Sequence, residues 1–134
     1  MAKLSSIEGI GEVYALKLKE AGVGSVEKLL EVGATARGRK ELAQKTGLSE
    51  AQILNWVNRA DLTRIKGVNT QYADLLEAAG VDSVPELAQR NPENLYAKLV
   101  ETNEVKKLVR KLPTPAQVKK WVEQAKELPR IVTH

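Results

Sequence analysis

Apolar residues recur at helical spacing through most of the chain. Within residues 12–21, four apolar side chains lie three or four positions apart, which places them on one face of a helix. These residues are Tyr14, Ala15, Leu18 and Ala21. Gly22 follows directly and is suited to end the helix in the left-handed conformation. The pattern therefore predicts an amphipathic helix over residues 12–21.

Residues that favour helix ends divide the next part of the chain. Ser25 precedes a short helix predicted over 26–32, and Gly33 is expected to stop it. A further helix over 35–46 is predicted to end at Gly47.

Capping boxes predict the remaining helix starts. Ser49 with Gln52, and Thr114 with Gln117, have the spacing at which side chain and backbone cap each other reciprocally. The first box predicts a helix from residue 50 to about residue 60. Three further caps are expected. Asp61 would cap a short helix leading into the second glycine turn, Ser83 and Glu86 would form a capping box with Pro85 in the first turn, and Asn91 would precede Pro92 at the first helical position.

A mixed apolar and basic stretch predicts a helix running through Glu104 to Leu112. Its apolar stripe would be Val105, Leu108, Val109 and Leu112. Its opposite side would carry the cations Lys106, Lys107, Arg110 and Lys111.

The stretch from Ile7 to Leu29, IEGIGEVYALKLKEAGVGSVEKL, returns at Ile65 to Leu87 as IKGVNTQYADLLEAAGVDSVPEL. Matching apolar, small and capping positions at a single shift indicate an internal duplication. Trp56 and Trp121 also match, but at a shift seven residues larger, so the second copy has gained residues between 88 and 114.

These patterns predict an all-α fold. We expect two repeats, residues 1–64 and 65–134, packed about a pseudo-twofold axis as one compact domain, because no linker rich in Gly, Ser or Pro separates them. Apolar residues make up 43% of the chain but aromatic residues only 4%, with no Phe, so the core must be mainly aliphatic.

Composition removes several classes of function. The chain has no Cys, and its single His is the last residue, so neither a disulfide framework nor a nitrogen and sulfur metal cluster is expected. No Ser lies in a G-x-S-x-G elbow, and no cofactor motif follows a strand. No signal core or membrane span is evident, so we expect a cytoplasmic, non-enzymatic protein without a cofactor, metal or membrane partner.

The segments around Gly9-Ile10-Gly11 and Gly67-Val68-Asn69 resemble the helix-hairpin-helix motif, over residues 7–22 and 65–80. Nearly the whole chain is also similar to an uncharacterised bacterial family, catalogued as a domain of unknown function and built from two such hairpins. The helix-hairpin-helix resemblance implies binding of the duplex DNA backbone, without reading of base sequence.

Glycine turns before a helix also favour phosphate binding on physical grounds. Outward backbone N–H groups and the positive end of the helix dipole meet at the same place, and such a nest holds a phosphate oxygen without a side chain. The candidate contacts at the two turns are Gly9, Ile10, Gly11, Lys66, Gly67, Val68, Asn69 and Thr70.

The second turn is the stronger candidate for phosphate binding. Glu8 and Glu12 flank the first turn and would repel an anion. Lys66, Thr70 and Gln71 surround the second turn, although Asn69 there replaces the second glycine and blocks the closest backbone approach. Asp74 and Glu77, on the helix that follows, also count against it.

Basic residues outnumber acidic ones by 21 to 17, which gives a net charge of +4. They cluster at residues 37–40 and 106–111, with Lys119 and Lys120 beyond, and each cluster is either a solvated helix face or a phosphate-contacting surface. If a cluster and a turn met one backbone, about four phosphates would be neutralised, with a salt slope of about −3.6.

Two functions remain open. The first is sequence-independent binding of nucleic acid, with duplex DNA the expected partner. The second is a helical adaptor for a protein partner, in which Ile10 and Val68 merely fill the core and Trp56 and Trp121 are core residues rather than stacking platforms. The sequence leaves the oligomeric state open.

Overall fold

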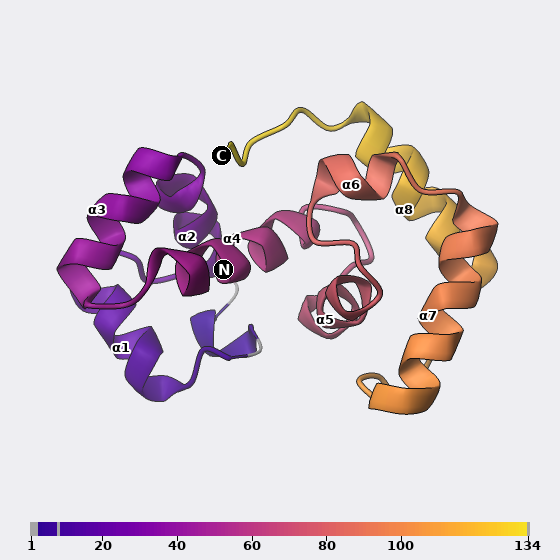
Figure 1. Ribbon diagram of the computed structural model, residues 1–134, viewed down its shortest axis with the longest axis horizontal. Coiled ribbons are helices and arrows are strands. Elements are labelled where there is room, and N and C mark those ends of the chain that lie inside the picture. Colours follow the sequence, from indigo (N-terminus) through magenta and orange to yellow (C-terminus); the bar gives the residue numbers. More distant parts are fainter. Residues whose placement is uncertain (1–2, 8, 134) are drawn as a thin grey trace. The chain divides into compact units, whose positions relative to one another are not determined.

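The computed structural model describes residues 3–7 and 9–133, and over these residues it is all helical, with no strand (Figure 1). Its elements are η1 Leu4–Ser6, α1 Glu12–Glu20, α2 Val26–Gly33, α3 Ala36–Thr46, α4 Glu50–Leu62, α5 Thr70–Ala78, α6 Val84–Ala88, α7 Pro92–Lys106 and α8 Pro115–Glu127. The predicted all-α class is therefore confirmed. The pseudo-twofold arrangement stays a prediction.

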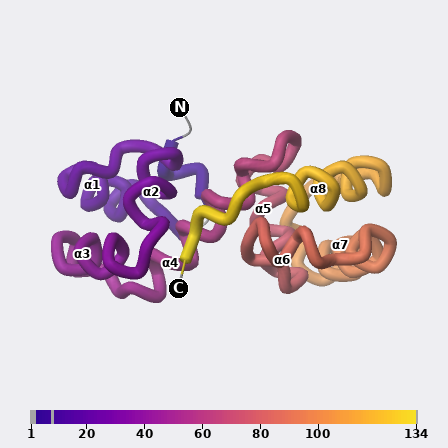
Figure 2. Tube along the Cα trace, turned by 90° about the horizontal axis from the view of Figure 1, so that it is seen from above, coloured from indigo at the N-terminus to yellow at the C-terminus, as the bar shows by residue number. Residues whose placement is uncertain are grey.

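The chain forms two units, each with its own aliphatic core around one buried tryptophan. The first unit comprises Met1–Asp61 with Ile131–His134, and the second comprises Leu62–Arg130. Leu18, Leu29 and Trp56 lie in the first core. In the second unit α8 packs against both α6 and α7, and α7 also contacts α5 (Figure 2).

The two glycines predicted to end helices do so in the same way. Gly22 and Gly80 have φ values of 92° and 96°. The N–H of Val23 donates to the Leu18 carbonyl at 2.8 Å, and the N–H of Val81 donates to the Leu76 carbonyl at 2.8 Å. These are Schellman motifs, which satisfy carbonyls that the helix leaves unpaired and bury an apolar residue on each side of the turn.

The predicted caps also form, except the one at Asp61. Ser25 and Ser83 accept from the N–H groups of Lys28 and Glu86. The boxes at Ser49 and Thr114 are both reciprocal. Asn91 caps α7 with Pro92 in its first turn.

The helix predicted through residues 104–112 is wrong. Helix α7 ends at Lys106, because Lys107 takes the left-handed conformation with φ 50°. The Asn103 side chain then forms two hydrogen bonds with the backbone of Val109, which lies beyond the helix end. Residues 107–114 therefore connect α7 to α8 without helix, and the expected stripe member Val105 is 80% exposed.

Two predicted boundaries shift for reasons of packing. Helix α4 continues through Asp61 to Leu62, so Asp61 lies buried within it and does not cap a separate helix. Gly33 is the last residue of α2. A side chain at this position would collide with Val57 of α4. Gly33 is needed for close helix contact rather than to stop the helix.

Among the described residues, no helix combines the length and apolar character needed to cross a bilayer.

Replacing Gly22 with alanine isolates the contribution of the left-handed turn. An added Cβ meets no atom within 4 Å, so the loss comes from backbone strain alone. We expect Gly22→Ala to lower the free energy of unfolding by about 1 kcal/mol, measured by urea denaturation.

Gly24 provides the matched control for this measurement. Its Cβ would also meet nothing within 4 Å, but its φ is not positive. Gly24→Ala should change stability by less than about 0.5 kcal/mol. Equal losses in the two variants would contradict the role assigned to Gly22.

Candidate nucleic-acid interface

The two glycine turns have nearly identical backbone geometry. Gly9 and Gly67 have φ values of 91° and 94°. The residue after each glycine donates its N–H to the isoleucine three positions earlier, at 3.1 Å in the first turn and 3.0 Å in the second. Its side chain enters the core, since Ile10 and Val68 are 3% and 4% exposed. Both the side chain and the backbone N–H of these two residues are therefore used inside the unit.

Each turn packs against a buried tryptophan, which is paired with a tyrosine. The ring centroids of Tyr14 and Trp56 are 5.6 Å apart, and those of Tyr72 and Trp121 are 5.4 Å apart. A Cβ added to Gly67 would lie 3.2 Å from the Trp121 indole nitrogen, and Gly9 is similarly close to Trp56. Both indoles are buried, so they support the turns from inside and are not exposed for base stacking.

The second glycine position of the motif needs no glycine for its conformation. Gly11 and Asn69 have φ values of −80° and −86°, which any residue adopts. Asn69 also caps α5, because its Oδ1 accepts the Tyr72 N–H at 2.8 Å. Gly11 provides no side-chain cap to α1.

Gln124 of α8 fixes the backbone of Lys66. The Lys66 N–H donates to Gln124 Oε1 at 3.0 Å, and Gln124 Nε2 donates to the Lys66 carbonyl at 3.2 Å. Both backbone groups of Lys66 are therefore used inside the unit. Only its exposed ammonium group remains for a ligand.

We call residues 107–111 the basic loop, and side chains from two helices hold it. Asn103 of α7 donates from Nδ2 to the Val109 carbonyl at 3.1 Å and accepts the Val109 N–H at 3.0 Å. Tyr72 of α5 donates from Oη to the Lys111 carbonyl at 3.0 Å. Val109 is buried in the core of the unit. The loop backbone is therefore fixed while its cations stay exposed.

The start of α5 and the basic loop enclose one open groove of about 340 Å³. Its lining comprises Asn69, Gln71, Tyr72, Lys107, Leu108, Val109, Arg110 and Lys111. Three cations and two amides thus face a shared space, a combination suited to phosphate oxygens.

The structure brings together four of the predicted site residues and not the others. Those in the groove lining are Asn69, Lys107, Arg110 and Lys111. Lys66, Gly67, Val68, Thr70 and Lys106 are outside the lining but in the same unit. Gly9, Ile10 and Gly11 belong to the first unit, and Glu8 lies outside the described residues.

Sequence reasoning missed Tyr72 and Asn103 as supports of the basic loop. Tyr72 matches Tyr14 in the repeat, and this match predicts only a place on the apolar face of its helix. Its hydroxyl partner lies 39 residues away, and no local pattern indicates it. Asn103 has no sequence signal either, because its role depends on α7 ending three residues later.

In the other basic cluster, at residues 37–40, Arg37 and Lys40 are exposed but Arg39 is buried. Arg39 is only 5% exposed, and its guanidinium donates to the carbonyls of Gly33, Ala34 and Thr133 at 2.8, 3.2 and 2.6 Å. Burial lowers the pKa of this guanidinium from its ordinary value, and the charge of Glu50 opposes that shift. Arg39 therefore ties residues 131–133 to the end of α2.

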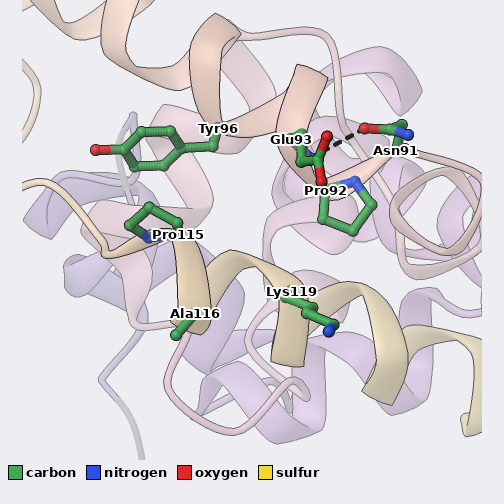
Figure 3. Close-up of a pocket in the computed structure, with 7 residues that line it drawn as sticks. All are labelled: Asn91, Pro92, Glu93, Tyr96, Pro115, Ala116 and Lys119. Carbon is green, nitrogen blue, oxygen red and sulfur yellow. Dashed lines mark hydrogen bonds between the residues drawn. The ribbon is translucent and has the colours of Figure 1, made fainter.

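A second open pocket, of about 500 Å³, lies where α7 and α8 begin (Figure 3). The Tyr96 ring faces Pro115 across it, and Asn91 accepts the Glu93 N–H at 3.0 Å on its far side. Lys119 is the one cation in the lining, and no predicted site residue contributes to it.

The described residues define an all-α protein whose two units each contain a glycine turn before a helix. The chain belongs to the family described as a domain of unknown function (DUF4332), whose model matches residues 8–128. No curated protein and no solved structure matches it.

Replacing Arg39 with alanine tests how much its hydrogen bonds to the three carbonyls stabilise the protein. Arg39→Ala leaves three carbonyls without their charged donor, so we expect a loss of about 3 kcal/mol in the free energy of unfolding. Arg37→Ala is the control, because the Arg37 side chain is 90% exposed and pairs with Glu41 at the surface. It should cost less than about 1 kcal/mol. Similar losses would mean that the Arg39 contacts contribute little.

Proposed function

We propose that the protein is a non-enzymatic, sequence-independent binder of the nucleic-acid backbone, with duplex DNA as its ligand. The observation that carries the proposal is the groove, where Lys107, Arg110 and Lys111 share one space with Asn69 of the second glycine turn. Phosphate contacts of this kind position a protein on nucleic acid without reading its bases.

The electrostatics of the groove support an anionic ligand. No Asp or Glu contributes to its described lining, so the three cations are not neutralised there. Arg110 offers a forked donor for two phosphate oxygens, and the lysines offer compact charges. The amide of Gln71 adds uncharged hydrogen-bonding capacity.

The glycine turn supports the same ligand. In the helix-hairpin-helix family that the turns resemble, the hairpin backbone contacts phosphates. Here the turn of Gly67, Val68 and Asn69 leads directly into α5, whose first residues line the groove. The exposed Lys66 ammonium adds a fourth cation to this region of the unit.

Salt dependence tests the proposal. Neutralisation of about four phosphates predicts a slope of about −3.6 in log affinity against log salt concentration. A fourfold rise in salt should then weaken binding roughly a hundredfold, measured by fluorescence anisotropy with a labelled duplex. Absence of binding at low salt would refute the proposal.

A triple variant assigns this salt dependence to the groove. Lys107→Gln, Arg110→Gln and Lys111→Gln together should change the slope from about −3.6 to about −0.9, because three of the four phosphate contacts are lost. The control changes net charge equally at exposed lysines of the first unit: Lys17→Gln, Lys19→Gln and Lys40→Gln. An equal change of the salt slope in both triple variants would indicate a non-specific effect of net charge.

One observation favours a protein partner as a second candidate function. Val13 and Leu16 lie one turn apart on α1 and are 68% and 57% exposed. Exposed apolar pairs on a helix are typical of protein contacts. A complex that survives high salt and is lost in Val13→Ser with Leu16→Ser, without DNA binding, would favour the adaptor function.

A further inference from the structure

The two units are alike around the glycine turn but differ in one connection. Three residues, 47–49, join α3 to α4 in the first unit, whereas eight residues, 107–114, join α7 to α8 in the second. Helix α7 is also longer than α3, at 15 residues against 11. The extra residues of the second unit thus lie in α7 and in the connection that follows it.

All three cations of the groove belong to this longer connection. Lys107, Arg110 and Lys111 lie within it, and Lys106 immediately precedes it. The corresponding connection of the first unit is Gly47, Leu48 and Ser49, which carries no charge. The first glycine turn is followed instead by Glu12, an exposed carboxylate at the first residue of α1.

We infer that phosphate binding belongs to the second unit alone, in the groove built by the basic loop, and that Tyr72 positions this loop. The inference rests on the proposed function, and it adds which unit binds and which uncharged residue organises the site. The first glycine turn then has an architectural role.

Tyr72 connects the glycine turn to the basic loop through a single side chain. Its ring packs on Trp121, which lies beneath Gly67, and its hydroxyl donates to the Lys111 carbonyl at 3.0 Å. This bond fixes the last residue of the loop, two residues beyond the Val109 backbone that Asn103 holds. Tyr14 has the matching ring contact with Trp56, but its unit contains no basic loop.

A matched pair of aspartates tests which unit binds. Asn69→Asp keeps an N-cap oxygen at α5 and adds one negative charge to the groove lining. Gly11→Asp adds the same charge at the matching position of the first turn, where φ is −80° and a Cβ meets nothing within 4 Å. Both variants are therefore expected to fold.

Affinity for a labelled duplex at low salt is the readout. Asn69→Asp should weaken binding about tenfold, through repulsion between the new carboxylate and a phosphate, and Gly11→Asp should change it less than twofold. A tenfold loss in Gly11→Asp, alone or in both variants, would overturn the inference while leaving the proposed function intact. Failure of the unmodified protein to bind would refute the proposed function itself.

Removal of one hydroxyl tests the positioning role. Tyr72→Phe keeps the ring on Trp121 and loses only the bond to Lys111, so affinity should fall about fivefold with the salt slope unchanged. Tyr14→Phe is the control and should leave affinity unchanged. A purely structural role for the Tyr72 hydroxyl would lower the unfolding midpoint but leave duplex affinity as it was, and that result would overturn the positioning role.

Discussion

The close approach of a tryptophan to a glycine turn is the constraint on which each unit depends. A Cβ at Gly9 or Gly67 would lie about 3 Å from an indole nitrogen, and both glycines have positive φ. Glycine is therefore required for its positive φ, and a Cβ there would also force the indole to shift. Because the indole supports the turn from within the core, the turn backbone and the start of the next helix are held at the surface.

The same framework carries different chemistry in the two units. The turn and the Schellman ending match closely because each depends on a short stretch of repeated sequence, and the aromatic pair matches because each unit buries a tryptophan against the repeated tyrosine. The connection before the last helix is free of these constraints. It is there that the second unit has lengthened. Three of the eight residues in this connection are basic, and Asn103 and Tyr72 hold its backbone.

Residues with equal formal charge have very different roles in this chain. Arg39 is buried and binds three carbonyls, whereas Arg110 is exposed and lines a groove. Both appear in short basic runs, and the sequence alone does not separate them. Their surroundings do, because Arg39 lies beside the end of α2 and residues 131–133, where three carbonyl groups accept its N–H groups.

The sequence by itself determined the helical class, most helix starts and the glycine-dependent turns, because these depend on contacts within about five residues. Only the tertiary structure decided that α7 ends at Lys106, that Arg39 is buried, and that Asn69 and the basic loop share a groove. Those outcomes depend on partners distant along the chain, such as the Lys111 carbonyl for Tyr72 and the Thr133 carbonyl for Arg39. Helical periodicity continued through Leu112, but tertiary packing of Val109 and its pairing with Asn103 prevailed over it.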